Sequence, residues 1–222
     1  MLTTGSTGQA RAFRLLHLTD PHLFADPAGE VYSVNTTDSL RRVLAQALAE
    51  PDGAPDAILL TGDIADDLSE TAYQRVRATL GQAAVPVFCI PGNHDDPAVM
   101  ARWLGDDGFQ CAGRARLGGW GLALLDSHVP GEPHGTISPA AFAALDGHLH
   151  VLRDLPTLLA VHHPPLPVGS PWIDAIGLRN ATELLARLER FPNVRVIVSG
   201  HVHQAFDAPP GALRVLTTPS TC

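Results

Sequence analysis

The chain has 222 residues, of which 45% are hydrophobic and 17% are charged, a balance typical of one soluble globular domain with ample material for a core. Its formal net charge is −8 and it has no cluster of lysine and arginine, which argues against a nucleic-acid-binding or membrane-binding surface. An acidic protein can still act on anionic phosphates where metal ions supply the positive charge.

Three widely spaced cysteines, Cys89, Cys111 and Cys222, indicate neither a zinc-binding spacing nor a disulfide framework, and they suit the reducing cytosol. Residues 1–12 are small and polar and lack the apolar segment of an export signal, so we interpret them as a flexible lead-in to a single domain of residues 13–222. No apolar run approaches membrane-spanning length. We therefore expect a cytoplasmic protein.

Strands and helices alternate through the first half of the chain. Strands are predicted over residues 13–18, 57–60 and 85–90, and helices over 36–48, 69–82 and 98–104. The first helix is expected to begin at Thr36 or Thr37 as its N-cap, and its apolar residues recur at helical spacing. This alternation predicts α/β architecture.

The second half is predicted to contain strands over residues 120–125, 157–161 and 194–198. One helix is expected to begin at Ser138 as N-cap with a proline in its first position, and another at Asn180, where Glu183 completes a capping-box spacing. Residues 164–178 are predicted to form a long loop. The later strands favour mixed pairing, so we expect two packed mixed β-sheets, a β-sandwich, flanked by helices.

Five predicted strands end in residues of the metal-ligand type. The motifs are Asp20-x-His22, Gly62-Asp63, Gly92-Asn93-His94-Asp95, His162-His163 and Gly200-His201-x-His203. Each motif alone is also typical of an ordinary turn. Their recurrence at five strand ends, with six of the eleven histidines, favours one shared metal site, because the ends of parallel strands meet at one rim.

The donor types indicate which ions would bind. Carboxylate, amide oxygen and imidazole without a thiolate suit iron, manganese or zinc. Seven or eight such ligands are too many for one ion, and they suit two ions about 3.5–4 Å apart that share a bridging carboxylate.

In this order the motifs resemble those of the calcineurin-like binuclear metallophosphoesterases. Further stretches resemble the bacterial class III cyclic-AMP phosphodiesterases, namely Phe24 and residues 34–36, 162–165, 178–181 and 218–222. The resemblance runs from about Phe13 to Cys222, and it implies a β-sandwich flanked by helices. Family members of this type usually continue with further strands, whereas this chain stops at Cys222; whether that end is natural stays open.

The resemblance implies a ligand set for two ions. It assigns one ion to Asp20, His22 and His203, and the other to Asn93, His162 and His201, with Asp63 bridging the two. The first histidine of the His-His-Pro-Pro stretch is the family's ligand, which selects His162 over His163. Iron and manganese are the expected pair, with zinc or cobalt as alternatives.

The same resemblance implies two catalytic residues, His94 facing the substrate phosphate and Asp95 orienting it. His22, Asn93, His94 and His203 are expected to lie within reach of the substrate. Two ions would lower the pKa of a water between them, so that hydroxide attacks the phosphate in line. His94 would then protonate the departing oxygen or stabilise the developing charge.

The expected activity is hydrolysis of 3′,5′-cyclic nucleotides, with cyclic AMP as first choice, to the nucleoside 5′-monophosphate. Two alternatives stay open. One is a phosphodiesterase for another small ester, such as a glycerophosphodiester or a nucleotide pyrophosphate. The other is a metal-free scaffold of the same fold. The oligomeric state cannot be inferred from the sequence.

Other residues near strand ends are interpreted as structural. Asp126 and His128 are expected to make structural hydrogen bonds, and His17 to pack in the core. The remaining histidines, His134, His148 and His150, are expected in a loop and on a helix surface. Trp172 and the loop around it would either line the pocket mouth and stack on a base or pack within the loop.

Overall fold

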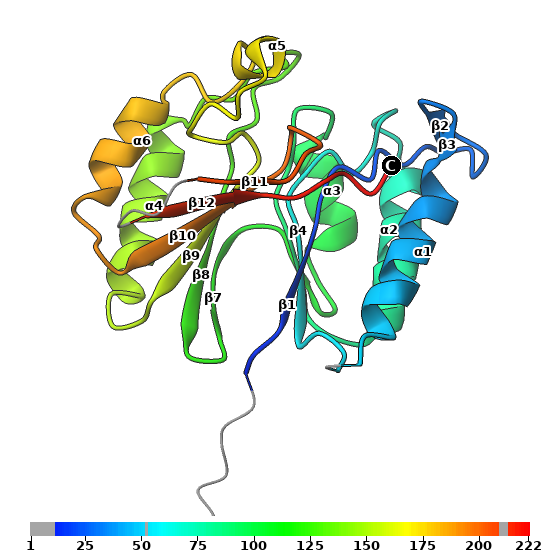
Figure 1. Ribbon diagram of the computed structural model, residues 1–222, viewed down its shortest axis with the longest axis horizontal. Helices are drawn as coiled ribbons and strands as arrows, with labels where there is room; N and C mark the ends of the chain where they lie inside the picture. Colours follow the sequence, from blue (N-terminus) through cyan, green and yellow to red (C-terminus); the bar gives the residue numbers. More distant parts are fainter. Residues whose placement is uncertain (1–11, 52, 209–212) are drawn as a thin grey trace, which may run out of the picture.

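The computed structural model describes residues 12–51, 53–208 and 213–222, and two β-sheets lie face to face in it between two layers of helices (Figure 1). The first sheet consists of β1 (Leu15–Leu18), β4 (Ala57–Leu60), β5 (Val87–Cys89) and β6 (Phe109–Gln110), in that order. The second sheet has the order β11-β12-β10-β9-β8-β7, with β7 (Gly113–Leu117), β8 (Trp120–Leu125), β9 (Thr157–Val161), β10 (Val194–Ser199), β11 (Phe206–Asp207) and β12 (Arg214–Thr217). A small hairpin joins β2 (Glu30–Val31) and β3 (Val34–Asn35).

The helices cover the outer faces of both sheets. The first sheet carries α1 (Thr36–Leu48), α2 (Glu70–Leu80), the short 3₁₀ helix η1 (Gly81–Ala83) and α3 (Pro97–Leu104). The second carries α4 (Pro139–Val151) and α6 (Ala181–Leu188), while α5 (Pro171–Asp174) lies in the loop before α6.

The pairing directions refine the expected sandwich. The described strands of the first sheet are all parallel, because helical crossovers connect them. The second sheet is mixed: β8, β9, β10 and β12 are parallel neighbours, whereas β7 and β11 pair antiparallel at its two edges. The expectation of two mixed sheets therefore holds only for the second.

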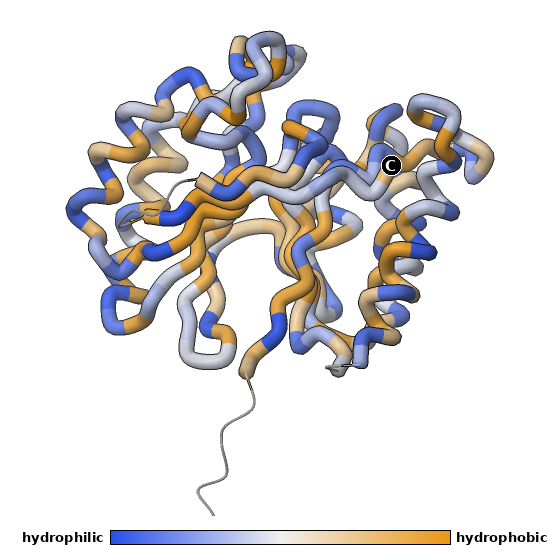
Figure 2. Tube along the Cα trace, viewed as in Figure 1, coloured by the Kyte–Doolittle hydropathy of each residue, from blue (hydrophilic) through white to orange (hydrophobic). Residues whose placement is uncertain are grey.

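Apolar residues alternate along the strands, so each sheet packs against helices with one face and against the other sheet with its opposite face. In β4, Ile58 and Leu60 join the core beneath α1 and α2. Ala57 and Leu59 face the second sheet, where they pack with Leu122 of β8. Figure 2 shows this concentration of hydrophobic residues along the strands, between the helix layers. Each predicted strand end is thereby held on a rigid, fully packed strand.

The helix starts test the predicted caps. Ser138 caps α4 as expected, accepting a hydrogen bond from the Ala141 N–H at 3.1 Å. The N-cap of α1 is Asn35, whose side chain accepts from the Asp38 N–H, so the assignment to Thr36 or Thr37 was wrong by one residue or two.

Asn180 is the residue before α6, as predicted, but the predicted capping box is not formed. Its side-chain oxygen accepts from the Ile137 N–H at 3.0 Å, and its amide donates to the Ile137 oxygen at 2.9 Å. Asn180 thus joins the loop before α4 to α6 and leaves the first turn of α6 without a side-chain cap.

Several short elements were not predicted. The strand β7 was missed, although the Gly118-Gly119 turn that joins it to β8 is one that the glycines predict, and β12, which pairs with β10, was missed as well. The loop predicted for residues 164–178 contains the single turn of α5. None of the helices in the described part of the chain has the length and apolar character needed to span a bilayer. Most of the predicted lead-in lies outside the described residues, and the single domain over residues 13–222 stays a prediction.

Candidate metal centre

Backbone hydrogen bonds join the loops that follow the strands of both sheets. The Asp20 N–H donates to the Gly62 oxygen at 3.0 Å, and the His22 N–H donates to the Asp63 oxygen at 3.0 Å. Across the second sheet, the Gly200 N–H donates to the His162 oxygen at 3.1 Å. The His201 N–H donates to the Asp20 carboxylate at 3.0 Å and so joins the rims of the two sheets.

The backbone at this rim is strained. Ten non-glycine residues in the described part of the chain have a positive φ, and five of them belong to the strand-end motifs: Asp20, His22, Asp63, His201 and His203. Their φ angles lie between 45° and 69°, in the left-handed region that L-residues seldom adopt. Such strain persists where the surrounding structure enforces it, and it concentrates at functional sites.

Close backbone approach explains the glycines of the motifs. A Cβ atom on Gly62 would lie 2.5 Å from Nδ1 of His162 and 2.6 Å from the Gly92 nitrogen. A Cβ atom on Gly92 would overlap the Asp63 carboxylate and lie 2.7 Å from Cε1 of His162. The two glycines let the loops after β4 and β5 meet at Asp63.

We expect Gly92→Ala to lower metal content at least about tenfold and to destabilise the fold by about 1–3 kcal/mol, since the new methyl group displaces the Asp63 carboxylate. Elemental analysis and thermal unfolding measure the two effects. Gly147→Ala in α4 is the control, because nothing lies within 4 Å of its Cβ position. Full metal content in Gly92→Ala would contradict this account of the loop.

One group of donors gathers at the first sheet. Single ligand atoms of Asp20, His22, Asp63 and His203 all lie within 4.8 Å of one another. Nε2 of His22 lies 3.2 Å from Nε2 of His203, which in turn lies 3.2 Å from Oδ1 of Asp20. Oδ2 of Asp63 lies 3.7 Å from the His22 nitrogen.

A second group lies on the other side of Asp63. Oδ1 of Asn93 lies 3.2 Å from Nε2 of His162 and 3.0 Å from Nδ1 of His201. Oδ1 of Asp63 lies 3.4 Å from the same His162 nitrogen. The Asp63 carboxylate thus faces one group with each oxygen, which is the geometry required of a bridging ligand.

The tautomer of His162 shows that the second group suits a cation. Its Nδ1 lies 2.6 Å from the Thr61 carbonyl oxygen, which can only accept, so Nδ1 carries a proton. Nε2 then faces the oxygens of Asn93 and Asp63 and needs either a second proton or an ion. Burial disfavours the charged imidazole, but the charge and hydrogen bond of Asp63, together with the charge of Asp20 and the hydrogen bond to Thr61, raise the pKa of His162 to about 9. A metal ion would replace that proton.

His201 points to the same conclusion. Burial and the neighbouring His162 charge lower its pKa to about 4, so the ring is neutral. Nδ1 faces the acceptor oxygen of Asn93, whereas the buried Nε2 has no hydrogen-bond partner. With the proton on Nε2, the lone pair of Nδ1 faces the Asn93 oxygen at 3.0 Å, and a cation held between these two acceptors would relieve their repulsion.

The Asp63 carboxylate is anionic at neutral pH. Burial opposes its ionisation, but the surrounding imidazoles of His162, His22 and His94 hold its pKa well below the usual range. A buried carboxylate surrounded by imidazoles attracts cations strongly.

His163 lies beside the second donor group, but neither of its ring nitrogens is free to bind an ion. One ring nitrogen each of His162, His163 and His201 lies within 4.8 Å of the others. However, Nδ1 of His163 lies 2.8 Å from the Ser127 hydroxyl, and Nε2 lies 3.3 Å from the Pro133 oxygen. With both nitrogens engaged, His163 supports the rim, and His162 is the histidine that faces the other ligands.

The structure contradicts the predicted role of Asp95. Its buried carboxylate accepts hydrogen bonds from the backbone N–H groups of Gly92, Ile64 and Ala65, at 2.8 to 3.1 Å, and from the Tyr73 hydroxyl at 3.0 Å. Asp95 therefore fastens the loop after β5 to the loop after β4. A carboxylate that is fully occupied by buried donors cannot orient His94.

Asp66 takes the position expected of Asp95. Its Oδ1 lies 3.5 Å from Nδ1 of His94 and 3.0 Å from Nδ1 of His22. The two histidine rings are edge to face, with centroids 4.9 Å apart. Sequence reasoning missed Asp66 because it lies three positions after Asp63, outside the motif. The pairing of Leu23 with Ala65 brings Asp66 to the rim, and this contact between two loops cannot be inferred from the sequence of either loop.

A hollow of about 430 Å³ adjoins His94, lined by Asp66, Leu68, Asn93, His94, Asp95, Asp96, Pro97, His128, Pro130 and Gly131. Asp126 accepts from the His128 N–H at 2.7 Å, the kind of bond expected for this pair, and the His128 residue itself lines the hollow. Trp172 does not line it and is 70% exposed on α5.

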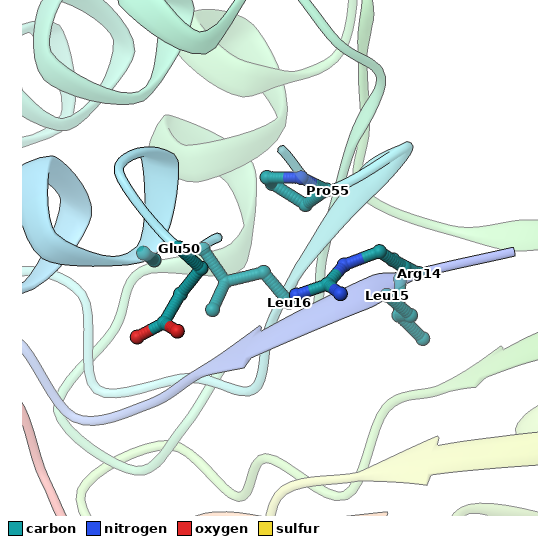
Figure 3. A pocket seen from close by; sticks show the side chains of 6 residues that line it. Arg14, Leu15, Leu16, Glu50 and Pro55 are labelled. Carbon is teal, nitrogen blue, oxygen red and sulfur yellow. The ribbon is translucent and has the colours of Figure 1, made fainter. Parts of the chain in front are cut away.

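Another hollow, beside the start of β1 and the end of α1 (Figure 3), contains none of the predicted site residues.

The other histidines lie away from the ligand groups. His17 is half-buried, contacts the Thr61 hydroxyl at 2.8 Å and lines a hollow between the sheets, so the expected core position holds only in part. On α4, His148 contacts Arg114 and His150 contacts Arg153, both at 3.1 Å near the surface. His134 lies 3.5 Å from Glu132 in the loop before α4.

Residues 13–205 match the calcineurin-like phosphoesterase family. The chain belongs to this family. It is 40% identical, over 100% of its length and 80% of the relative's, to the 3′,5′-cyclic adenosine monophosphate phosphodiesterase CpdA of Escherichia coli K12. It is 34% identical to a 3′,5′-cyclic-nucleotide phosphodiesterase of Nostoc, over 94% of this chain and 78% of that protein. Membership implies a divalent metal centre, which the donor groups described above fit.

Solved structures confirm the fold. A dimetal phosphatase from Danio rerio superposes with a TM-score of 0.72 at 18% identity, over 94% of this chain and 88% of that one. GAP50, the anchor in the inner membrane complex of Plasmodium, superposes with a TM-score of 0.61 at 13% identity, over 94% and 72%. Since a phosphatase and an anchor of a membrane complex share this fold, the activity of this chain has to be argued from its site.

Proposed function

We propose that this protein is a binuclear metal-dependent phosphodiesterase that hydrolyses 3′,5′-cyclic nucleotides, with cyclic AMP as the preferred substrate, to the nucleoside 5′-monophosphate. The observation that carries the proposal is the Asp63 carboxylate, which faces a separate group of donors with each of its oxygens. The 40% identity to a cyclic AMP phosphodiesterase supports the choice of substrate.

In this proposal Asp20, His22 and His203 hold one ion, Asn93, His162 and His201 hold the other, and Asp63 bridges them. Iron and manganese are the proposed pair, with zinc and cobalt as alternatives, because the donors are imidazoles and oxygens. When bound, such a pair supplies positive charge for the phosphate oxygens and an activated water.

His94 acts on the leaving group. Its side chain is 44% exposed and lines the hollow, while its Nδ1 faces the Asp66 carboxylate. With Nδ1 turned to Asp66, Nε2 is the nitrogen available to the substrate and donates a proton to the departing ribose 3′ oxygen. Asp66 acts through His94 as a positioning residue.

The hollow beside His94 would hold the nucleoside half of the substrate. Its volume of about 430 Å³ lies within the range of small-molecule sites. Leu68, Pro97 and Pro130 give it apolar surface against which a base can pack, and Leu68 is 55% exposed. The hollow is thus open enough to admit a planar ring.

We expect Leu68→Trp to raise the KM for cyclic AMP about tenfold, since the larger side chain fills the hollow. The nucleoside would lose contacts that it makes equally in the ground state and in the transition state, so kcat should stay the same. A methyl aryl phosphodiester, which has no nucleoside, should be hydrolysed at an unchanged kcat/KM. Trp172→Leu is the matched control and should leave both substrates unaffected. A larger effect at Trp172 than at Leu68 would locate the base at α5.

A turnover panel tests the proposed function. Metal-loaded protein is incubated with cyclic AMP, cyclic GMP, a 2′,3′-cyclic nucleotide, a glycerophosphodiester and a nucleotide pyrophosphate. The highest kcat/KM should be for cyclic AMP, with adenosine 5′-monophosphate as product. Faster glycerophosphodiester or pyrophosphate cleavage would favour another small ester, and no turnover with both ions bound would favour a scaffold.

The proposal places the protein in the cytoplasm, without a nucleic-acid or membrane partner. Cys89, Cys111 and Cys222 are free, which suits a reducing compartment. The net charge of −8 repels nucleic acids and anionic lipids.

A further inference from the structure

Cys222 lies at the rim although the cysteine spacing of the sequence indicated no metal site. One ligand atom each of His22, His203 and Cys222 lies within 4.8 Å of the others. A zinc–sulfur bond is about 2.3 Å long and a zinc–nitrogen bond about 2.0–2.1 Å, so donors on opposite sides of one ion are about 4.4 Å apart. The upper bound of 4.8 Å on the three donor atoms is close to that distance.

The segment that carries Cys222 is fastened to the ligand loop. The Thr221 N–H donates to the Thr19 oxygen at 3.2 Å, and the Ser220 hydroxyl donates to the Asp20 oxygen at 2.8 Å. The Ser39 hydroxyl of α1 donates to the Thr221 oxygen. In Figure 1 this end of the chain, marked C, lies beside the helices that cover the first sheet. These bonds give the thiol a defined position beside Asp20, which is itself a member of the donor group.

Among the described residues, the thiol hydrogen-bonds to Ser220 alone. The Ser220 hydroxyl lies 2.8 Å from Sγ of Cys222 and also accepts from the Cys222 N–H at 2.9 Å. A thiol is a weak hydrogen-bond donor, so little is lost when its sulfur turns toward an ion.

The geometry points to Cys222 as an additional, soft donor to the ion that His22 and His203 would hold. Binding exchanges the thiol proton for the ion, and the proton passes to solvent. Sulfur favours zinc, iron or cobalt over manganese and magnesium, so this half of the centre should select a thiophilic ion. The inference rests on the two-metal centre of the proposed function and assigns the metal preference of one half.

Cobalt(II) absorption tests the inference without reference to activity. Cobalt-loaded wild-type protein should show a sulfur-to-cobalt charge-transfer band in the near ultraviolet. Cys222→Ser should lose the band while binding the same amount of cobalt by elemental analysis. Cys111→Ser is the matched control, because the Cys111 thiol donates to the Leu104 oxygen and should leave the band intact.

Alkylation by iodoacetamide, read by peptide mass spectrometry, gives a second measurement. Metal loading should slow modification of Cys222 at least about tenfold, since ion and reagent compete for the same sulfur, and should leave Cys111 unchanged. A band that persists in Cys222→Ser, or equal alkylation with and without metal, would overturn the role of Cys222 alone. Absence of bound cobalt in wild-type protein would overturn both this inference and the proposed metal centre.

Discussion

Asp63→Ala should remove both metal ions and lower cyclic nucleotide hydrolysis by at least about 10³-fold, since each ion stabilises the transition state by several kcal/mol. The two Asp63 oxygens face different donor groups, at 3.7 Å from His22 and 3.4 Å from His162. Loss of this one side chain therefore weakens both groups together. Elemental analysis of protein purified without chelator, alongside kcat/KM, measures the effect.

Two controls make the Asp63 result interpretable. Asp38→Ala on α1, where the acid is exposed, should keep both ions and full activity. His203→Ala should cost the ion of the first group to a greater extent than that of the second. If Asp63→Ala retained two ions, the bridging assignment would be wrong.

Asp63→Ala can also be tested in metal-free protein, through the pKa of His162. Against the effect of burial, Asp63, with smaller contributions from Asp20 and the Thr61 oxygen, raises the pKa of His162 from 6.5 to about 9. The pair therefore stabilises the metal-free fold fully below pH 6.5 and ceases to do so as the pH rises through 9. Asp63→Ala should lower the His162 pKa, which an NMR titration of the ring protons would detect.

The main features of the site could be predicted because they depend on rigid, local rules. A buried strand such as β4 has a strong apolar signal, and its carboxyl end has to be followed by the rim residues Gly62 and Asp63. With five such ends, the α/β sandwich and the grouping of donors at one rim follow from sheet geometry. The helix start at Ser138 was equally local, because the cap and the proline adjoin each other.

What could not be predicted depends on contacts between distant segments. Asp95 and Asp66 are both acids near a motif, and only the tertiary structure shows that Asp95 is occupied by Ile64 and Tyr73 while Asp66 reaches His94. Cys222 approaches the donor group of His22 across some 200 positions of sequence, so cysteine spacing carried no signal of it.

Edge strands were missed for another reason. β7 alternates between half-buried and exposed residues, with Arg114 and Arg116 pointing outward, so its apolar signal is weak. The four residues of β12 gain their strand conformation by pairing with β10 and β11. Strands at or near a sheet edge are short and polar, and the pairing partner decides their structure.

His94→Ala should lower kcat for cyclic AMP by about 10²–10⁴-fold while both ions stay bound, because a general acid contributes about that much. The ribose 3′ oxygen is strongly basic and needs a proton as it departs. A nitrophenolate is a far weaker base, so a nitrophenyl phosphodiester should lose much less activity in the same variant. Comparison of the two substrates, with metal content measured on each preparation, isolates the proton transfer.

Asp66→Asn separates orientation from proton donation. Oδ1 of Asp66 contacts both His94 and His22, so the variant should lower kcat for cyclic AMP less than His94→Ala does, because the His94 ring keeps its proton-donating nitrogen but loses the charged acceptor that positions it. If His94→Ala slowed both substrates by the same factor with both ions retained, His94 would stabilise phosphoryl charge and not the leaving group. If the ions were lost as well, His94 would be a ligand. The 3.5 Å contact between Nδ1 of His94 and Asp66, together with the exposure of the ring toward the hollow, favours the proton-donating role over either.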